Sequence, residues 1–212
     1  MKIGVFDSGK GGTTVLEAIK RVLPNEEYKY IGDSKNCPYG EKSDEELMRI
    51  VCGIVDELCD FGAEIIVIAC NTATAKCIDK LRELYPKIEF VGTEPAIKLA
   101  VATGAEKILV MATPGTIESE RLHELVRDNK MNNQKIELLA CAGLADAIEK
   151  DENVDEVLNR LLKGKKNYDV VVLGCTHYSL IRDRIQKYFP EALLIDGNDG
   201  VASRVQQIVQ KH

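Results

Sequence analysis

Two cysteines of the chain lie in the same kind of sequence context, each directly after a run of apolar residues. Cys70 follows the run Ile65–Ala69, and Cys175 follows the run Val170–Gly174. A thiolate can accept a proton and a thiol can return one, so cysteines can act as acid–base groups. Two such groups on either side of one small anionic molecule would remove a proton from one face and return one to the other. That chemistry is racemisation or epimerisation.

The residues after each cysteine are polar and open a predicted helix. They include Asn71 and Thr72 in the first half of the chain and Thr176 in the second. A helix N-terminus carries partial positive charge and free N–H groups, which lower the pKa of a nearby thiol from ~8.5 and can bind a carboxylate. We therefore expect an accessible thiolate near neutral pH and one carboxylate-binding site in each half. The alternative is a pair of buried thiols inherited by duplication.

Four further side chains could assist this chemistry. Asp7 follows the first apolar run and His177 follows Cys175 by two residues, so each could orient or charge a thiol. Alternatively, Asp7 forms an Asx-turn and His177 satisfies a backbone carbonyl. Thr113 and Thr116, in a loop of the second half, could supply hydroxyls to a carboxylate or simply cap the next helix.

The glycine-rich turn at residues 7–12 would let a ligand approach the backbone closely. Gly4, Gly9 and Lys10 have the spacing that opens a phosphate-binding P-loop, but position 11 is glycine and Gly4 falls inside the first predicted strand. The turn also misses the dinucleotide-binding fingerprint. Nucleotide binding is therefore not predicted.

Short apolar runs alternate with amphipathic segments along the whole chain, which is typical of strand–helix–strand units and a mainly parallel sheet. The predicted strands are Lys2–Phe6, Tyr28–Gly32, Glu64–Ala69, Ile88–Gly92, Lys107–Ala112, Lys135–Ala140, Asp169–Gly174 and Ala192–Ile195. The predicted helices include Gly11–Val22, Asp44–Asp60 with Ser43 as its N-cap, and Thr72–Leu84 before Pro86. In an open α/β sheet ligands bind at the carboxyl ends of strands, where both cysteines are expected.

The eight predicted strands form two sets of four with a nearly constant offset. Cys70 and Cys175 are 105 residues apart. The pairs Cys37/Cys141 and Pro86/Pro190 are each 104 residues apart. A period of this length indicates two similar domains. We predict an α/β protein of two pseudosymmetric lobes, each a mainly parallel four-stranded sheet flanked by helices, with the active site in the cleft between them. The first lobe comprises residues 1–95 and about 196–212, and the second comprises 96–195.

The composition argues against several function classes. The 212 residues are 45% hydrophobic and 29% charged, with a net charge of −6 and no long run of Lys or Arg, so no nucleic-acid partner is expected. No apolar run approaches the ~18 residues that span a bilayer and no signal-peptide pattern opens the sequence, so we expect a cytoplasmic protein without a membrane partner. The seven cysteines include no Cys-x-x-Cys pair, which predicts neither a zinc site nor a disulfide framework. Cys52, Cys59 and Cys77 are interpreted as small buried hydrophobes.

Several short motifs occur in order along the chain. They are Asp7-Ser8-Gly9 with Gly11-Gly12, Asp33, Pro38-Tyr39-Gly40 with Ser43, Ala69-Cys70-Asn71-Thr72-Ala73, Thr113 with Thr116-Ile117 and Ser119, and Gly174-Cys175-Thr176-His177-Tyr178. Together they resemble the glutamate racemases of the aspartate/glutamate racemase superfamily, over nearly the whole chain. The resemblance implies cofactor-independent interconversion of L- and D-glutamate by two bases, supply of D-glutamate for peptidoglycan, and a pseudosymmetric homodimeric protein.

The resemblance also implies roles for individual residues. Cys70 and Cys175 match the catalytic thiol pair. Asp7 and His177 match residues that assist these thiols, and Glu149 matches a further acidic residue near the site. The implied substrate-binding residues are Ser8, Asp33, Pro38, Tyr39, Gly40, Asn71, Thr72, Thr113, Thr116 and Thr176. No metal ligand and no cofactor are implied.

Three positions depart from the usual pattern of these racemases. Ala142 and Ser179 stand where proline is usual, Ser179 directly after Thr-His-Tyr, and Cys37 stands before the Pro-Tyr-Gly turn where other residues are usual. The chain is also shorter than typical members. None of these departures changes the catalytic pair.

Three other functions stay open from the sequence. An aspartate racemase, or another amino-acid racemase, would use the same thiols on a different side chain. A thiol hydrolase would use Cys175 with His177, although a spacing of two residues argues against a good hydrogen bond between them and Cys70 would have no role. A non-catalytic amino-acid-binding module would bind dicarboxylates without exchanging the α-proton.

Overall fold

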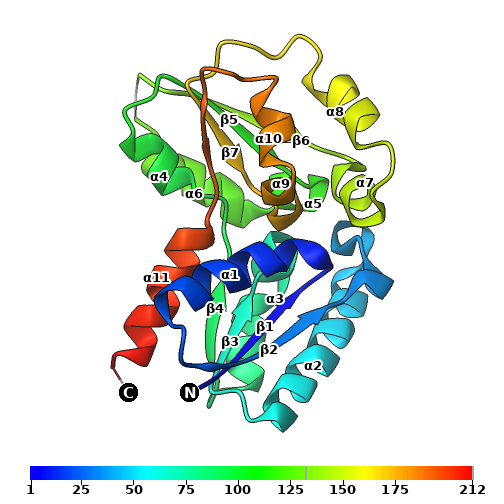
Figure 1. The fold of residues 1–212 in the computed structure, drawn as a ribbon, viewed down its shortest axis with the longest axis vertical. Helices are drawn as coiled ribbons and strands as arrows, with labels where there is room; N and C mark the ends of the chain where they lie inside the picture. Colours follow the sequence, from blue (N-terminus) through cyan, green and yellow to red (C-terminus); the bar gives the residue numbers. More distant parts are fainter. Residues whose placement is uncertain (132, 212) are drawn as a thin grey trace. The chain divides into compact units, whose positions relative to one another are not determined.

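The computed structural model describes residues 1–131 and 133–211, which fold as two compact units (Figure 1). The first unit comprises Met1–Thr93 and the C-terminal segment that begins at Asn198, and the second comprises Glu94–Gly197. The chain therefore passes from one unit to the other twice, after Thr93 and after Gly197. Each unit contains one parallel sheet of four strands.

The sheet of the first unit has the strand order β2-β1-β3-β4. Its strands are β1 (Lys2–Asp7), β2 (Glu27–Gly32), β3 (Ile65–Ile68) and β4 (Glu89–Gly92). Its helices are α1 (Thr13–Val22), α2 (Asp44–Phe61), α3 (Asn71–Leu84) and α11 (Asn198–Val209), with short 3-10 turns η1 (Lys10–Gly12), η2 (Ser34–Asn36) and η3 (Tyr39–Glu41). The register pairs Phe6 of β1 with Ile68 of β3, so Asp7 and Cys70 emerge at the same edge of the sheet.

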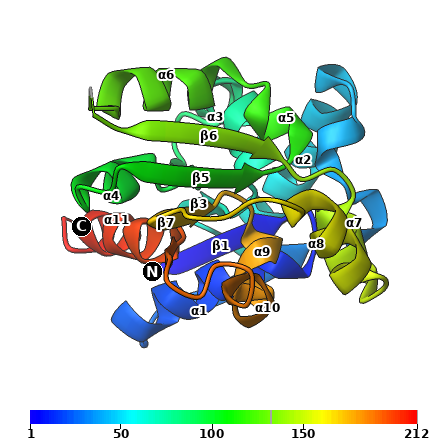
Figure 2. The same cartoon turned by 90° about the horizontal axis from the view of Figure 1, so that it is seen from above.

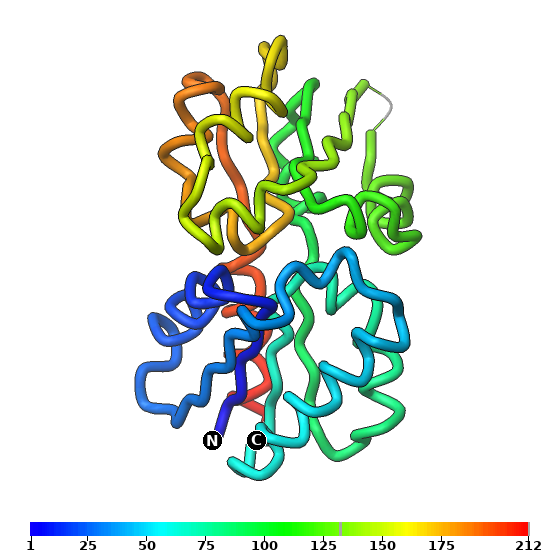
Figure 3. The backbone as a smooth tube through the Cα atoms, turned by 90° about the vertical axis from the view of Figure 1, so that its right-hand side faces the viewer, coloured from blue at the N-terminus to red at the C-terminus, as the bar shows by residue number. Residues whose placement is uncertain are grey.

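The continuous apolar run of β3 is explained by helices on both faces of the sheet. Ile65 and Val67 pack with residues of α1 and α11, whereas Ile66 and Ile68 pack with residues of α2 and α3. The C-terminal helix α11 returns to this unit and packs against α1 (Figure 3). Both faces of the central strands are therefore buried, and the free carboxyl ends are the places left for polar residues.

The sheet of the second unit has the equivalent order β6-β5-β7-β8, of which Figure 2 shows β6, β5 and β7 side by side. Its strands are β5 (Lys107–Ala112), β6 (Lys135–Ala140), β7 (Val170–Leu173) and β8 (Leu193–Ile195). Its helices are α4 (Ile97–Ala102), α5 (Pro114–Ile117), α6 (Glu120–Asn129), α7 (Leu144–Lys150), α8 (Val154–Leu162), α9 (Thr176–Leu180) and α10 (Arg182–Gln186). Val170 and Val172 pack towards α4 and α6, and Val171 and Leu173 towards α7 to α10.

The predicted fold class is confirmed. Strands and helices alternate along the chain and form two parallel four-stranded sheets, each flanked by helices. All eight predicted strands are present, and their ends differ from the prediction by at most one residue. Helix α2 begins after Ser43, whose Oγ accepts a hydrogen bond from the Glu46 N–H at 3.2 Å, as its N-cap pattern predicts. Helix α1 begins at Thr13 and not at Gly11, because the two glycines before it form the turn η1.

The internal repeat is present in the strand order, but one of the residue pairs that suggested it is not equivalent in the fold. Cys141 directly follows β6, whereas Cys37 lies beyond η2, well after the end of β2. Cys70 and Cys175, in contrast, both precede the helix after the third strand of their sheets. The equal spacing of Cys37 and Cys141 is therefore a coincidence of loop lengths.

Among residues 1–131 and 133–211, no helix is long and apolar enough to cross a membrane. Within the same described ranges, no three His, Cys, Asp or Glu side chains form a group that could hold a metal ion.

Candidate active site

Cys70 lies between β3 and α3 and is the N-cap residue of that helix. Its side chain is only 6% exposed. Its Sγ accepts a hydrogen bond from the Ala73 N–H at 3.5 Å, and its thiol donates one to Ser8 Oγ at 3.7 Å. The sulfur thus takes the place that a serine or aspartate oxygen usually has at a helix N-terminus.

The pKa of Cys70 is raised to about 12. Burial is the main cause and the Asp7 carboxylate adds to it, because both disfavour a thiolate. The Ala73 N–H, the Ser8 hydroxyl and the Thr72 N–H lower the pKa but do not outweigh these two effects. The prediction of a lowered pKa is therefore wrong for this thiol: the helix N-terminus acts in the expected direction, but burial and a neighbouring carboxylate prevail.

Asp7 ends β1 and is fully buried. Its Oδ2 accepts a hydrogen bond from the Gly12 N–H at 2.7 Å, which spans five residues and is not an Asx-turn. A Cβ at position 12 would lie 2.5 Å from the Asp7 Cβ and 3.1 Å from the Ala69 Cβ, so only glycine fits there. The glycine-rich turn therefore closes around the Asp7 carboxylate, on the side of the sheet edge that carries Cys70.

The turn with the Pro-Tyr-Gly motif brings a phenol to the same group of residues. Tyr39 is buried, and its hydroxyl donates a hydrogen bond to Asp33 Oδ2 at 2.8 Å. Burial and this carboxylate raise the pKa of Tyr39, and the charges of Cys70 and Asp7 raise it further. Tyr39 thus keeps its proton and stays a hydrogen-bond donor near the thiol.

Asp33 is held by a residue that sequence reasoning missed. Asn36 Nδ2 lies 2.9 Å from each carboxylate oxygen of Asp33. The only signal in the sequence is the spacing of three residues between them, which is common in any polar turn. Pro38, which follows a cis peptide bond, and Gly40 flank Tyr39 and are half-buried in the same turn.

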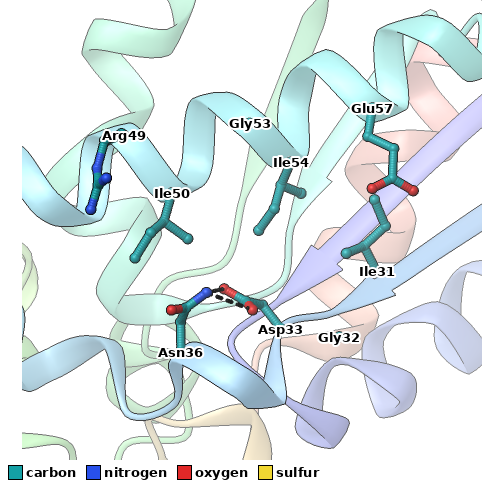
Figure 4. Close-up of a pocket in the computed structure, with 9 residues that line it drawn as sticks. All are labelled: Ile31, Gly32, Asp33, Asn36, Arg49, Ile50, Gly53, Ile54 and Glu57. Carbon is teal, nitrogen blue, oxygen red and sulfur yellow. Dashed lines mark hydrogen bonds between the residues drawn. The ribbon is translucent and has the colours of Figure 1, made fainter.

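A cavity of about 460 Å³ lies between the end of β2 and α2 (Figure 4). It is lined by Ile31, Gly32, Asp33, Asn36, Arg49, Ile50, Gly53, Ile54 and Glu57. Figure 4 shows Ile50 and Ile54 extending from α2 towards the hydrogen-bonded pair of Asp33 and Asn36. Cys70 does not line this cavity, but Asp33, which does, accepts the hydrogen bond from Tyr39 near the thiol.

Asn71 and Thr72 are the first residues of α3, and both side chains are buried. Within the described part of the chain, the Asn71 Oδ1 has no hydrogen-bond partner. A buried amide oxygen without a partner is costly, so it indicates a place for a donor on a bound molecule.

Cys175 takes the equivalent place in the second unit, between β7 and α9, and is also buried. Its Sγ lies 3.8 Å from His177 Nδ1. The other ring nitrogen, His177 Nε2, lies 2.8 Å from Glu149 Oε2 on α7. The spacing of two residues argued against a good hydrogen bond between Cys175 and His177, and the structure shows a long contact of 3.8 Å between the two side chains. The extended backbone of Cys175 and the immediate start of α9 bring both side chains to one side.

Three threonines surround the carboxyl ends of β5 and β7. Thr113 caps α5: its Oγ1 accepts a hydrogen bond from the Thr116 N–H at 3.4 Å, and the two hydroxyl oxygens are 3.0 Å apart. Thr116 and Thr176 are buried, Thr176 as the first residue of α9. The capping role considered for Thr113 is thus present, and it also fixes the position of the hydroxyls.

Tyr178 is a second neighbour that sequence reasoning left without a role. It is fully buried, and its hydroxyl donates a hydrogen bond to the Cys141 carbonyl at 3.5 Å. Burial raises its pKa well above the usual value, and the charges of Cys175 and Cys141 contribute. The motif that contains Tyr178 is visible in the sequence, but nothing there distinguishes this ring from a core residue.

The ionisable neighbours of the two thiols lie at different positions in the two halves. Asp7 is the last residue of β1, whereas the last residue of the equivalent strand β5 is Ala112. His177 is the second residue of α9, whereas the second residue of α3 is Thr72. The ionisable neighbour of the thiol therefore lies on the neighbouring strand in the first unit, and on the cysteine's own helix, in contact with Glu149, in the second.

A comparison with known protein families identifies the family of this chain. The sequence profile of the family described as Asp/Glu/Hydantoin racemase matches residues 3–205. This chain belongs to that family. The resemblance predicted from the motifs is therefore confirmed.

Several members of the racemase family are similar over the full length of this chain. The glutamate racemase of Clostridium novyi (strain NT) is 39% identical over 220 residues, which cover 100% of this chain and 85% of that protein. The Escherichia coli glutamate racemase in complex with L-glutamate and the activator UDP-MurNAc-ala has a TM-score of 0.88 and 32% identity, covering 99% of this chain and 82% of that one. The glutamate racemase of Francisella tularensis subsp. tularensis SCHU S4 in complex with D-glutamate has a TM-score of 0.82 and 30% identity, covering 99% and 81%.

Proposed function

We propose that this racemase interconverts L-glutamate and D-glutamate without a cofactor, with Cys70 and Cys175 as its two bases. The observation that carries the proposal is that each thiol precedes the helix after the third strand of its sheet and has its own acid–base neighbour. The solved relatives with L-glutamate and D-glutamate support glutamate as the substrate.

In the proposed mechanism the two cysteines act on opposite faces of the α-carbon. One thiolate removes the α-proton, and the electron pair of the broken C–H bond stays on the carbon. The other cysteine, as a thiol, donates a proton to the opposite face, where the electron pair forms the new C–H bond. The first cysteine ends as a thiol and the second as a thiolate, so each serves one enantiomer.

The α-proton of an amino acid is a far weaker acid than a thiol, so the site has to stabilise the carbanion. Fixed hydrogen-bond donors around the α-carboxylate are the means that the proposal assigns to this chain. They are the N–H groups at the starts of α3 and α9 and the side chains of Asn71, Thr72 and Thr176. The other proposed substrate-binding residues are Ser8, Asp33, Pro38, Tyr39, Gly40, Thr113 and Thr116. Exclusion of water strengthens each of these interactions.

Different neighbours are proposed to adjust the charge of the two thiols. His177 accepts the proton of Cys175 at Nδ1, and Glu149 stabilises the resulting imidazolium through Nε2. Asp7 serves the first unit. A substrate ammonium group near Asp7 offsets the carboxylate charge that raises the Cys70 pKa, and so favours the Cys70 thiolate when substrate is bound.

The proposal includes a cellular role and an assembly. The D-glutamate is proposed to supply peptidoglycan synthesis in the cytoplasm, and the protein is proposed to act as a homodimer. Light scattering of the purified protein tests the assembly, since a dimer has twice the mass of the chain.

Circular dichroism of L-glutamate with the purified protein, without added cofactor, tests the function. We expect the ellipticity to decay to zero. L-aspartate in the same assay distinguishes an aspartate racemase, for which aspartate would be the faster substrate. Cys70→Ser and Cys175→Ser should both abolish racemisation and leave the fold intact.

Deuterium exchange of the α-proton resolves the two bases. In D₂O each serine variant should exchange the α-proton of only one enantiomer, and the two variants should differ in which one. Near-wild-type turnover by either variant would refute the two-base assignment. The wild-type protein should lose α-hydrogen from both enantiomers.

The contacts of His177 with Cys175 on one side and Glu149 on the other also favour a second candidate function, that of a thiol hydrolase. In that function Cys175 attacks an acyl carbon, the leaving group takes the proton from His177, and water then hydrolyses the thioester. Mass spectrometry after reaction with an activated ester tests it. An acyl group on Cys175 together with ester turnover would support the hydrolase, and racemisation without either supports the first proposal.

A further inference from the structure

Thr74 joins the helix behind Cys70 to the segment that leaves the first unit. It lies one helical turn after Cys70, and its side chain is 2% exposed. Its Oγ1 accepts a hydrogen bond from the Thr93 N–H at 3.0 Å and donates one to the Ile68 carbonyl at 3.2 Å. Thr93 directly follows β4 and is the last residue before the chain passes into the second unit.

The packing around Thr74 leaves little freedom for this contact. A Cβ at position 92, the residue before Thr93, would lie 2.5 Å from the Thr74 Cγ2 and 2.8 Å from the Ile78 Cδ1. Glycine at this position therefore allows β4 to end directly against α3. The hydroxyl of Thr74 fixes that approach.

Ser179 makes the corresponding connection in the second unit. It lies one helical turn after Cys175, and its Oγ donates a hydrogen bond to Asp196 Oδ2 at 3.1 Å. Asp196 directly follows β8, just before the chain returns to the first unit after Gly197. Arg182 strengthens the connection, since its Nη2 lies 2.7 Å from the same Asp196 oxygen.

The two connections occupy equivalent places but are chemically different. Thr74 and Ser179 each lie four residues after the cysteine of their half, and each contacts the first residue after the last strand of its sheet. Thr74 accepts from a backbone N–H, whereas Ser179 donates to a carboxylate.

We propose that Thr74 and Ser179 are positioning residues, each of which holds one catalytic cysteine in place by fixing its helix to a segment that links the two units. Residues four apart lie on the same side of a helix, so a side chain one turn after the N-cap controls the rotation of the first turn. Thiols that act on a single carbon need accurate placement, because small displacements lower the rate strongly. The effect of these residues on α-proton exchange rests on the proposed function, whereas their effect on the position of the two thiols does not.

The structural consequence is tested by alkylation of the two thiols with iodoacetamide, followed by mass spectrometry of the separate peptides. Thr74→Val removes the hydroxyl and keeps the shape of the side chain. We expect it to speed alkylation of Cys70 about fivefold, the effect of one lost hydrogen bond, and to leave Cys175 unchanged. Ser179→Ala should speed alkylation of Cys175 about fivefold and leave Cys70 unchanged. Thr74→Ser, which keeps the hydroxyl, should react like the wild type.

The kinetic consequence is tested by α-proton exchange in D₂O with each enantiomer of glutamate. Each variant should slow the exchange of the enantiomer served by its own cysteine about fivefold, with the KM changed much less than kcat. Thr103→Val is the matched control, because it removes a threonine hydroxyl bonded to the Ala100 carbonyl at the end of α4. It should change neither exchange rate.

The two proposals fail in different ways. If the wild type exchanges no α-proton, the proposed function is overturned, and the alkylation pattern still decides the positioning role. If the wild type racemises but Thr74→Val and Ser179→Ala change both thiols and both enantiomers equally, or change neither, the positioning role is overturned. Equal changes would mean only a general loss of stability.

Discussion

His177 Nε2 lies 2.8 Å from Glu149 Oε2, and both side chains are largely buried. An imidazole that donates from Nε2 to a carboxylate presents the lone pair of Nδ1, which here lies 3.8 Å from Cys175 Sγ. Glu149 therefore selects the form of His177 that can accept a proton from the thiol. In the proposed mechanism the same carboxylate stabilises the imidazolium once the proton has moved.

Replacing Glu149 tests this relationship. Glu149→Gln removes the charge but keeps the size of the side chain, and we expect it to lower kcat about 10- to 100-fold, the value of one hydrogen bond to a charged group. Glu152→Gln, at an exposed position just after α7, is the matched control and should keep full activity. Equal kcat values for the wild type and Glu149→Gln would show that the carboxylate does not act through His177.

Asp7 should control the ionisation of Cys70. Its carboxylate raises the pKa of the thiol, so Asp7→Asn should lower that pKa and increase the fraction of thiolate at a given pH. The rate of Cys70 alkylation against pH measures this, with the curve shifted to lower pH in the variant. Asp79→Asn, exposed on the same helix α3, should leave the curve in place. A shift to higher pH in Asp7→Asn would contradict the assignment.

Gly53 lies in the interior of α2 and lines the cavity of Figure 4. A Cβ at this position would have no atom within 4 Å other than those of its chain neighbours and its own helix backbone. Since glycine costs a helix interior about 0.5–1 kcal/mol relative to alanine, Gly53→Ala should raise the free energy of unfolding by about that amount. Urea denaturation measures the change. A decrease would mean that the cavity has to stay open for the fold to be stable.

The sequence was sufficient for the parts of the site that follow from strand ends. Buried parallel strands appear as continuous apolar runs, so the residue where such a run stops is at the sheet edge. Cys70, Cys175 and Asp7 were placed correctly at those edges for this reason. The division of the strands into two sets of four also followed from the spacing, whereas the order of the strands within each sheet was not predicted.

The contacts between elements distant in the chain could not be derived in this way. Nothing in the spacing pairs His177 with Glu149, which are 28 residues apart on α9 and α7, and Glu149 was found only through family resemblance. The shift of the Cys70 pKa was predicted in the wrong direction. The helix N-terminus, which lowers this pKa, can be predicted from the local sequence, whereas the burial and the Asp7 charge that raise it depend on tertiary packing. The hydrogen bond of Tyr39 to Asp33 depends on the path of an irregular turn.

Alkaline pH should destabilise the folded chain through its buried thiols. Burial raises the pKa values of Cys70, Cys77 and Cys141 from 9.0 to about 12. Above pH 9.0 the unfolded chain therefore releases protons that the folded chain retains, so the free energy of unfolding falls as the pH rises towards 12. Urea midpoints across this interval measure the slope. Cys77→Ala removes one of these thiols and should make the slope shallower; an unchanged slope would show that Cys77 does not contribute.

A methyl group added at Gly12 should lower both the stability of the protein and its kcat. The Cβ of Gly12→Ala would lie 2.5 Å from the Asp7 Cβ and 3.0 Å from the Tyr30 hydroxyl, so either β1 or the turn has to move. We expect a loss of about 1–3 kcal/mol in the free energy of unfolding, as in other overpacked cores. Because the same shift displaces the N–H that binds Asp7 Oδ2, kcat should fall even under conditions where the variant is fully folded. Gly53→Ala is the matched control, since the same substitution in open space should stabilise the protein and preserve kcat. A Gly12→Ala protein with wild-type stability and kcat would show that the turn does not hold Asp7 in the position that the proposed mechanism requires.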